Sequence, residues 1–119
     1  MRACTLAAVF CGLTFAAGNA ADFAGKYASH RGGYNQEAEI VAAADSTYKV
    51  EVYVGTDGCS GAFDGAGRIE GAALVAHKTD DDACRLTISR TATGIKIVED
   101  RCLDWHGASC DFNGALRKR

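Results

Sequence analysis

Three residues near the carboxyl end of the chain have types and spacing that suit a metal site. Cys102, His106 and Cys110 follow one another at intervals of four residues, and thiolate and imidazole are ligands that zinc prefers. They would share one face only on a helix, whereas Asp104 and Gly107 favour a loop. We therefore expect no metal and no cofactor, and we interpret Cys102 and Cys110 as disulfide residues.

Residues for hydrolytic catalysis are present, but they follow no known local pattern. A catalytic triad needs a nucleophile, a base and an orienting group, and Ser60, His77 and His106 are available beside several aspartates. The glycine-rich segment 55–67 lacks the following helix and the lysine of a phosphate-binding loop. We expect a protein without catalytic residues that is not an enzyme, and an activity centred on His106 is the alternative.

The first 20 residues have the order of a secretory signal peptide. Arg2 gives a positive start, Leu6–Ala17 is an apolar run, and Gly18 and Ala20 occupy positions −3 and −1 of a cut before Ala21. A membrane span needs about 20 apolar residues. We therefore expect cleavage and export to the periplasm, with no stable membrane anchor.

The remaining residues, 21–119, have the length of a single domain. The chain has 13 Lys and Arg against 15 Asp and Glu, and loss of Arg2 with the leader leaves a net charge near −3. Nucleic-acid binding is therefore not expected, since there is no excess of cations to neutralise phosphates. The 48% hydrophobic content is that of a globular protein.

Four cysteines remain after the leader is removed, an even number that suggests two disulfides in an oxidising compartment. Three pairings are open. We favour Cys59–Cys84 and Cys102–Cys110, because the second pair closes a short local loop and leaves the other two as partners.

Hydrophobic residues recur with the period of two that is typical of strands. Between residues 48 and 54, apolar Tyr48, Val50, Val52 and Val54 alternate with outward positions. Six further segments follow the same rule or flank a turn: 23–28, 37–42, 68–76, 84–89, 95–97 and 111–116. Short strands at this spacing predict a small, disulfide-stapled antiparallel β-barrel of seven or eight strands, with a β-sandwich as the alternative. Small residues are expected to fill its narrow interior; they are Ala38, Ala42, Ala72 and Gly114.

Segment 55–63, which follows the 48–54 strand, is the best candidate for binding. It is predicted to be a glycine-rich loop with short polar side chains, held at its centre by the disulfide of Cys59. A loop held in this way loses less entropy when it docks on a partner. An ordinary hairpin without a partner is the plain alternative.

Within this segment, Ser60-Gly61-Ala62-Phe63 resembles the Ser-Gly-x-x-Tyr loop of the periplasmic and membrane-bound bacterial inhibitors of C-type lysozyme, with Phe63 in place of Tyr. Segment 102–114 is also similar to the end of small exported proteins of the same broad group. The resemblance implies an exported β-barrel that inserts this loop into the cleft of a C-type lysozyme, its protein partner. The residues expected to bind lysozyme are Asp57, Gly58, Ser60, Gly61, Ala62 and Phe63.

Other residues are expected to extend that contact. Asp57, Asp104 and the turn 80–82 would face the basic rim of lysozyme, and Trp105 and Tyr53 are apolar anchor candidates. Two alternatives remain: an immunity protein against another cell-wall hydrolase, and a small-ligand barrel with Trp105, Tyr27 and Tyr34 at its mouth. The oligomeric state stays open, a homodimer included.

Overall fold

The computed structural model describes residues 23–119, so the predicted signal peptide, 1–20, lies outside the described residues. Eight antiparallel strands pair in chain order, and β9 pairs with β2 through Tyr27–Lys118 and Ala28–Arg117 to close a barrel. The predicted all-β antiparallel barrel is therefore confirmed. Within residues 23–119, no helix is long and apolar enough to cross a membrane. The strands are β2 (Gly25–Arg31), β3 (Tyr34–Ala42), β4 (Tyr48–Thr56), β5 (Cys59–Glu70), β6 (Ala73–Lys78), β7 (Asp81–Arg90), β8 (Gly94–Asp100) and β9 (Gly114–Lys118), with short 3₁₀ helices η1 (Ala44–Ser46) and η2 (Leu103–Trp105).

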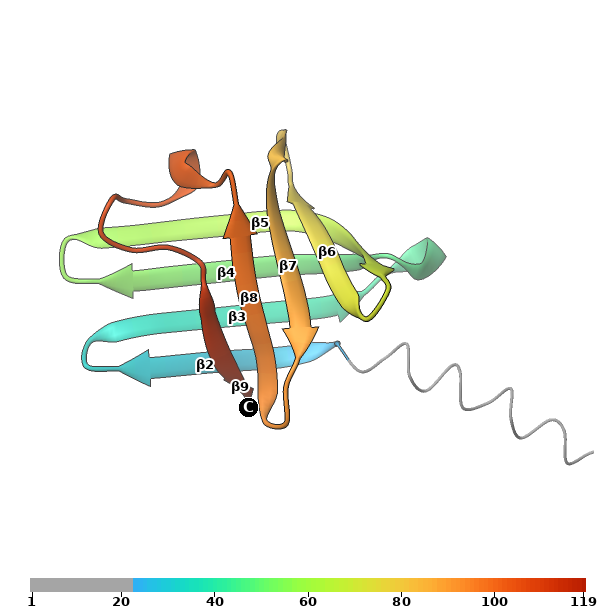
Figure 1. Ribbon diagram of the computed structural model, residues 1–119, viewed down its shortest axis with the longest axis horizontal. Helices are drawn as coiled ribbons and strands as arrows, with labels where there is room; N and C mark the ends of the chain where they lie inside the picture. The colour runs from blue at the N-terminus through green and yellow to red at the C-terminus, as the bar shows by residue number, and fades with distance from the viewer. Residues whose placement is uncertain (1–22) are drawn as a thin grey trace, which may run out of the picture.

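The barrel is built as two crossed layers, one of β2 to β5 and one of β6 to β9 (Figure 1). The long strand β5 belongs to both, since it pairs with β4 and then with β6. Gly65 lies where the two pairings overlap, opposite both Val50 and Lys78. A β-carbon there would lie 2.1 Å from the carbonyl oxygen of His77, so the close approach of β5 and β6 requires glycine at this position.

The interior is filled by side chains that point inward at every second position of each strand. Val50 and Val52 of β4, Leu86 and Ile88 of β7, and Ile95 and Ile97 of β8 are all buried. The ring of Phe112, which precedes β9, meets that of Phe63 edge to face at 6.1 Å between centroids. Burial of these side chains is the main force that closes the two layers.

Two of the small residues expected inside the barrel lie on its surface. Ala72 is in the turn between β5 and β6, where Gly71 has a φ of +64°, and Ala42 is exposed at the end of β3. Ala38 is buried as expected, and Gly114 packs against the side chain of Gln36. Ala42 still pairs with Tyr48, but it is the last residue of its strand and is exposed there, and Ala72 lies outside the strands.

The favoured disulfide pairing is wrong: the bonds are Cys59–Cys110 and Cys84–Cys102. Cys102 leaves the end of β8 beside β7, so it meets Cys84 at a Cα–Cα distance of 4.6 Å. The chain between Cys102 and Cys110 does not close on itself. It crosses the barrel end to the β4–β5 hairpin, where Cys110 meets Cys59 at 6.0 Å.

Candidate functional site

Segment 55–63, which was predicted to be a glycine-rich loop, is the tip of the β4–β5 hairpin. Thr56 pairs with Cys59, which leaves Asp57 and Gly58 as a two-residue turn. Gly58 has a φ of +74°, a conformation that favours glycine, and Asp-Gly is a strong hairpin signal between alternating segments. The tip is therefore a regular turn between two paired strands rather than a loop.

The tip residues divide into exposed and buried positions. Asp57, Gly58, Ser60 and Ala62 are exposed, whereas Phe63 is 1% exposed and belongs to the core. The surface open to a partner, called the tip from here on, comprises those four exposed residues. Within the part of the chain that the structure describes, the Ser60 hydroxyl has no hydrogen-bond partner, so its donor and acceptor both face solvent.

A second segment, 101–113, holds the tip in place and is called the closing segment (Figure 1). It joins β8 to β9 and is bonded to the start of β5 by the Cys59–Cys110 disulfide. The amide of Gly107 donates to the carbonyl oxygen of Ser60 at 3.0 Å, and His106 pairs with Gly61 as an isolated β-bridge. The backbone of the tip is thus fixed by covalent and polar contacts on one side.

The closing segment is held by polar groups far away in the sequence. The Tyr34 hydroxyl accepts from the amide of Asp111 and lies 3.0 Å from its carbonyl oxygen, and the Gln36 amide donates to the Asn113 carbonyl. On β8, the Glu99 carboxylate accepts from the Phe112 amide at 2.8 Å. These bonds explain why the segment crosses to the hairpin instead of forming a local loop.

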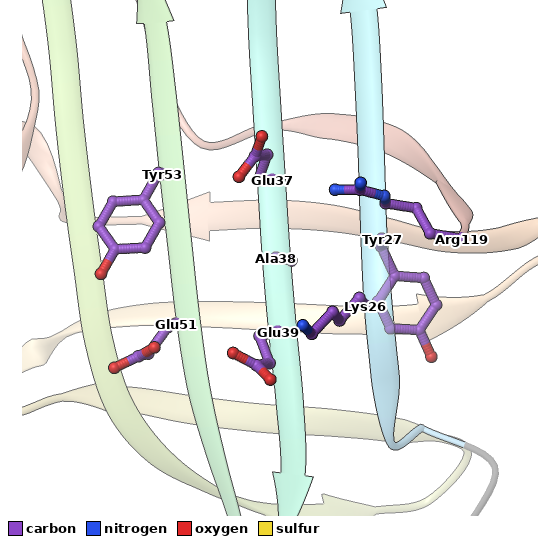
Figure 2. Close-up of a pocket in the computed structure, with 8 residues that line it drawn as sticks. All are labelled: Lys26, Tyr27, Glu37, Ala38, Glu39, Glu51, Tyr53 and Arg119. Atoms are coloured by element: carbon purple, nitrogen blue, oxygen red, sulfur yellow. The ribbon is translucent and has the colours of Figure 1, made fainter.

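An acidic surface borders the tip along β3 and β4. Glu37, Glu39, Glu51 and Tyr53 project outward from the same face and line a shallow hollow, whose other side is lined by Lys26 and Arg119 (Figure 2). Glu39 lies directly opposite Glu51, and Glu37 lies opposite Tyr53. Tyr53 is 52% exposed. We call these four residues the acidic face.

The acidic face adjoins the tip, because Tyr53 of β4 lies opposite Ala62 of β5. On the same side of β4, Tyr53 is followed by Gly55, which has open space above it and lies opposite Ser60. Like charges directly opposite one another destabilise a sheet. Glu39 lies between Lys26 of β2 and Glu51 of β4, so Lys26 offsets part of this repulsion and a cationic partner near Glu51 would relieve the rest.

The sequence also predicted acidic contacts at Asp104 and in the turn 80–82. Asp81, in the turn 80–82, instead accepts from the Trp105 indole N–H at 2.7 Å, and Asp104 is exposed on η2. Lys78 covers the Trp105 ring at 4.0 Å from its centroid and contacts Asp64 at 2.9 Å. Of the two anchor candidates, Tyr53 is thus the open one. The period-two spacing of the glutamates in β3 and β4 was the available signal.

The other expected clusters are not brought together. Tyr27 donates to the Phe23 carbonyl, Tyr34 bonds to the Asp111 backbone, and Trp105 donates to Asp81. Each of the three aromatic residues expected at the mouth of a ligand-binding barrel thus bonds to a different partner. Cys102 and Cys110 are each in a disulfide and are not free to bind a metal. Within residues 23–119, no group of three His, Cys, Asp or Glu side chains is placed to hold a metal ion.

No protein-family model matches the chain, and neither a curated protein nor a solved structure is significantly similar to it. The tip, the closing segment and the acidic face are therefore the features that indicate a function.

Proposed function

We propose that this chain is an exported protein inhibitor of a C-type lysozyme and that it occludes the enzyme's cleft with the tip. The observation that carries the proposal is a projecting hairpin end whose Ser60 hydroxyl is free, while the Ser60 carbonyl accepts from the Gly107 amide and the neighbouring Cys59 is disulfide-bonded to Cys110. A rigid surface loses little conformational entropy when it binds. This is the property that a loop inserted into a cleft needs.

The chemistry of the tip suits such a cleft. A C-type lysozyme presents a carboxylic acid kept protonated by an apolar site and a second, ionised carboxylate. A serine hydroxyl both donates and accepts hydrogen bonds, so Ser60 can bond to either group without burying an unpaired charge. Gly58 has no side chain, which allows the backbone to approach closely.

The acidic face supports a cationic partner. The net charge of the chain is only −2, but on the surface beside the tip Glu37, Glu39 and Glu51 outnumber Lys26 and Arg119, which line the same hollow. Local charge complementarity speeds association more than it strengthens the final complex. The two disulfides are in keeping with an oxidising compartment such as the periplasm.

The test is lysis of a peptidoglycan suspension by a C-type lysozyme, titrated with the oxidised protein. We expect stoichiometric loss of lysis, and at least about tenfold weaker inhibition by Ser60→Trp, which is about 1.4 kcal/mol of binding free energy. Ser89→Trp is the matched control, because Ser89 is an exposed strand serine of β7, outside the tip and the acidic face.

Two results would contradict the proposal. One is full lysis in the presence of a large excess of protein that circular dichroism shows to be folded and thiol titration shows to be oxidised. The other is inhibition that Ser60→Trp and Ser89→Trp leave equally strong. Binding to another cationic cell-wall hydrolase, with no effect on lysozyme, would support the immunity-protein alternative instead.

A further inference from the structure

A buried ion pair lies directly behind the tip. The side chains of His106, in the closing segment, and Glu99, on β8, are 3% and 11% exposed, and His106 Nε2 lies 3.0 Å from Glu99 Oε2. The imidazole meets the Phe112 ring edge to face at 5.2 Å between centroids. The pair is thus enclosed by the closing segment and the barrel end.

The contacts of the ring determine its protonation. His106 Nδ1 lies 2.7 Å from the carbonyl oxygen of Gly107, which only accepts, so Nδ1 carries a hydrogen. Nε2 faces a carboxylate that already accepts the Phe112 amide through its other oxygen. A neutral imidazole has only one N–H. Both contacts are therefore satisfied together when the ring is an imidazolium and Glu99 is ionised.

The electrostatic surroundings agree with that assignment. Burial of the ring lowers the pKa of His106, but the Gly107 carbonyl and the Glu99 carboxylate, with a smaller contribution from Asp111, outweigh it, so the pKa is raised. Asp111 belongs to the closing segment and Glu99 to β8. On the side of β5, the residue paired with His106 is Gly61, which has no charge.

The ion pair is connected to the tip through two adjacent residues. Gly107 accepts from the His106 ring and donates its own amide to the Ser60 carbonyl. His106 lies so close to Gly61 that a β-carbon on Gly61 would stand 2.4 Å from His106 Cβ. Any movement of the ring therefore changes the position of the backbone on which Ser60 is held.

We propose that His106 and Glu99 are a positioning pair for the tip, and that binding through Ser60 weakens when the His106 imidazolium loses its proton. The effect on binding rests on the proposed function, whereas the positioning of the tip backbone by His106 and Glu99 does not. The pKa of His106 is raised in the folded state. The ion pair between His106 and Glu99 is therefore fully present below the ordinary histidine pKa of about 6.5, and it is lost as the pH rises through the pKa of His106 in the folded protein.

The experiment measures hydrogen exchange of the Gly107 amide in the whole oxidised protein by NMR, between about pH 6 and about pH 9. The Thr91 amide, which donates to Gly94 at 2.9 Å at a distant turn, serves as the internal reference. We expect the protection factor of Gly107 to fall about tenfold relative to Thr91 across this range. The ring nitrogens of His106 should both be protonated at the acidic end.

Glu99→Gln is the decisive variant. A glutamine amide donates to the Nε2 of a neutral ring and still accepts the Phe112 amide, so we expect Gly107 to stay protected and its pH dependence to disappear. His106→Gln should lower Gly107 protection at every pH. His77→Gln is the matched control, because His77 is exposed on β6 and its ring bonds, among residues 23–119, to the Asp82 carbonyl.

Lysozyme inhibition is measured in parallel as the ratio of the wild-type to the Glu99→Gln inhibition constant, which cancels the pH dependence of the enzyme itself. The ratio should change about tenfold over the same range. Constant Gly107 protection in the wild type, or a neutral His106 ring at about pH 6, would overturn the proposal. If Gly107 behaves as expected and lysozyme is never inhibited, the positioning pair stands and the proposed function fails.

Discussion

Gly107 lies so close to Cys59 that a β-carbon on Gly107 would stand 2.6 Å from the Cys59 sulfur. Since that sulfur is bonded to Cys110, it has little freedom to move. Gly107→Ala should therefore displace the closing segment and lower the free energy of unfolding by about 1–3 kcal/mol, as overpacking does elsewhere. It should also weaken inhibition, because the bond from Gly107 to Ser60 shifts.

Gly55→Ala is the matched control for that change. Gly55 is a strand glycine of β4 with nothing within 4 Å of the added β-carbon. Its effect on the free energy of unfolding should stay within about 0.5 kcal/mol. Urea unfolding monitored by fluorescence of Trp105 compares the two variants. Equal midpoints would contradict the prediction, because the closing segment would then accommodate the added methyl group without loss of stability.

The two disulfides should differ in their contribution to stability. Cys59–Cys110 spans 51 residues and Cys84–Cys102 spans 18, so loop entropy predicts about 4 and about 3 kcal/mol. Replacing the first pair by serine should destabilise the protein more and should also release the tip. Thermal unfolding of both double variants tests the order, and a larger loss from the second pair would contradict it.

The pairing itself is checked by mass spectrometry of a non-reduced digest. Trypsin alone is insufficient, because no Lys or Arg lies between residues 102 and 116 and both Cys102 and Cys110 stay on one peptide. A second cut after Trp105 separates them. The peptide with Cys59 should then be linked to the one with Cys110.

The barrel was predictable from sequence because most strands show their own alternation, as β4 does. The wrong disulfide pairing has a different origin. The path of the closing segment is set by Tyr34 and Gln36, which bond to Asp111 and Asn113 across 77 positions in sequence. No local pattern reports contacts at that separation, so the short loop between Cys102 and Cys110 was favoured for proximity alone.

The candidate site was predictable in part. Asp57-Gly58 between alternating segments signals a two-residue turn, and that turn sets the register in which Phe63 lies opposite Val52. Phe63 then points inward with Val52, as the structure shows. The His106–Glu99 pair was beyond reach, since its two residues meet only when the closing segment folds back over β8.

Asp64 should make stability depend on pH at the acidic end. Its hydrogen bond to Lys78 lowers the pKa of its carboxyl group below 3.8, and this outweighs the opposing effect of burial. A carboxyl group whose pKa is lowered on folding contributes stability at pH values above its pKa in the unfolded chain. This stability is lost as the pH falls through its pKa in the folded protein. Asp64→Asn should therefore reduce the loss of stability between about pH 5 and about pH 2. Asp57→Asn, at the exposed turn, should leave that loss unchanged, and equal acid profiles for wild type and Asp64→Asn would contradict the prediction.

The acidic face should control how fast the partner is met. Glu39 and Glu51 lie opposite one another beside Tyr53, so replacing either by lysine reverses charge where a cationic lysozyme would approach. We expect Glu51→Lys to lower the association rate about tenfold at low salt, with the difference fading near 0.5 M salt as screening grows. The free energy of unfolding should not fall, because the repulsion between the two glutamates is removed.

Glu70→Lys, at the end of β5 away from this face, is the control for net charge. Surface plasmon resonance at several salt concentrations decides the matter, and equal association rates for Glu51→Lys and Glu70→Lys would remove the acidic face from the binding surface.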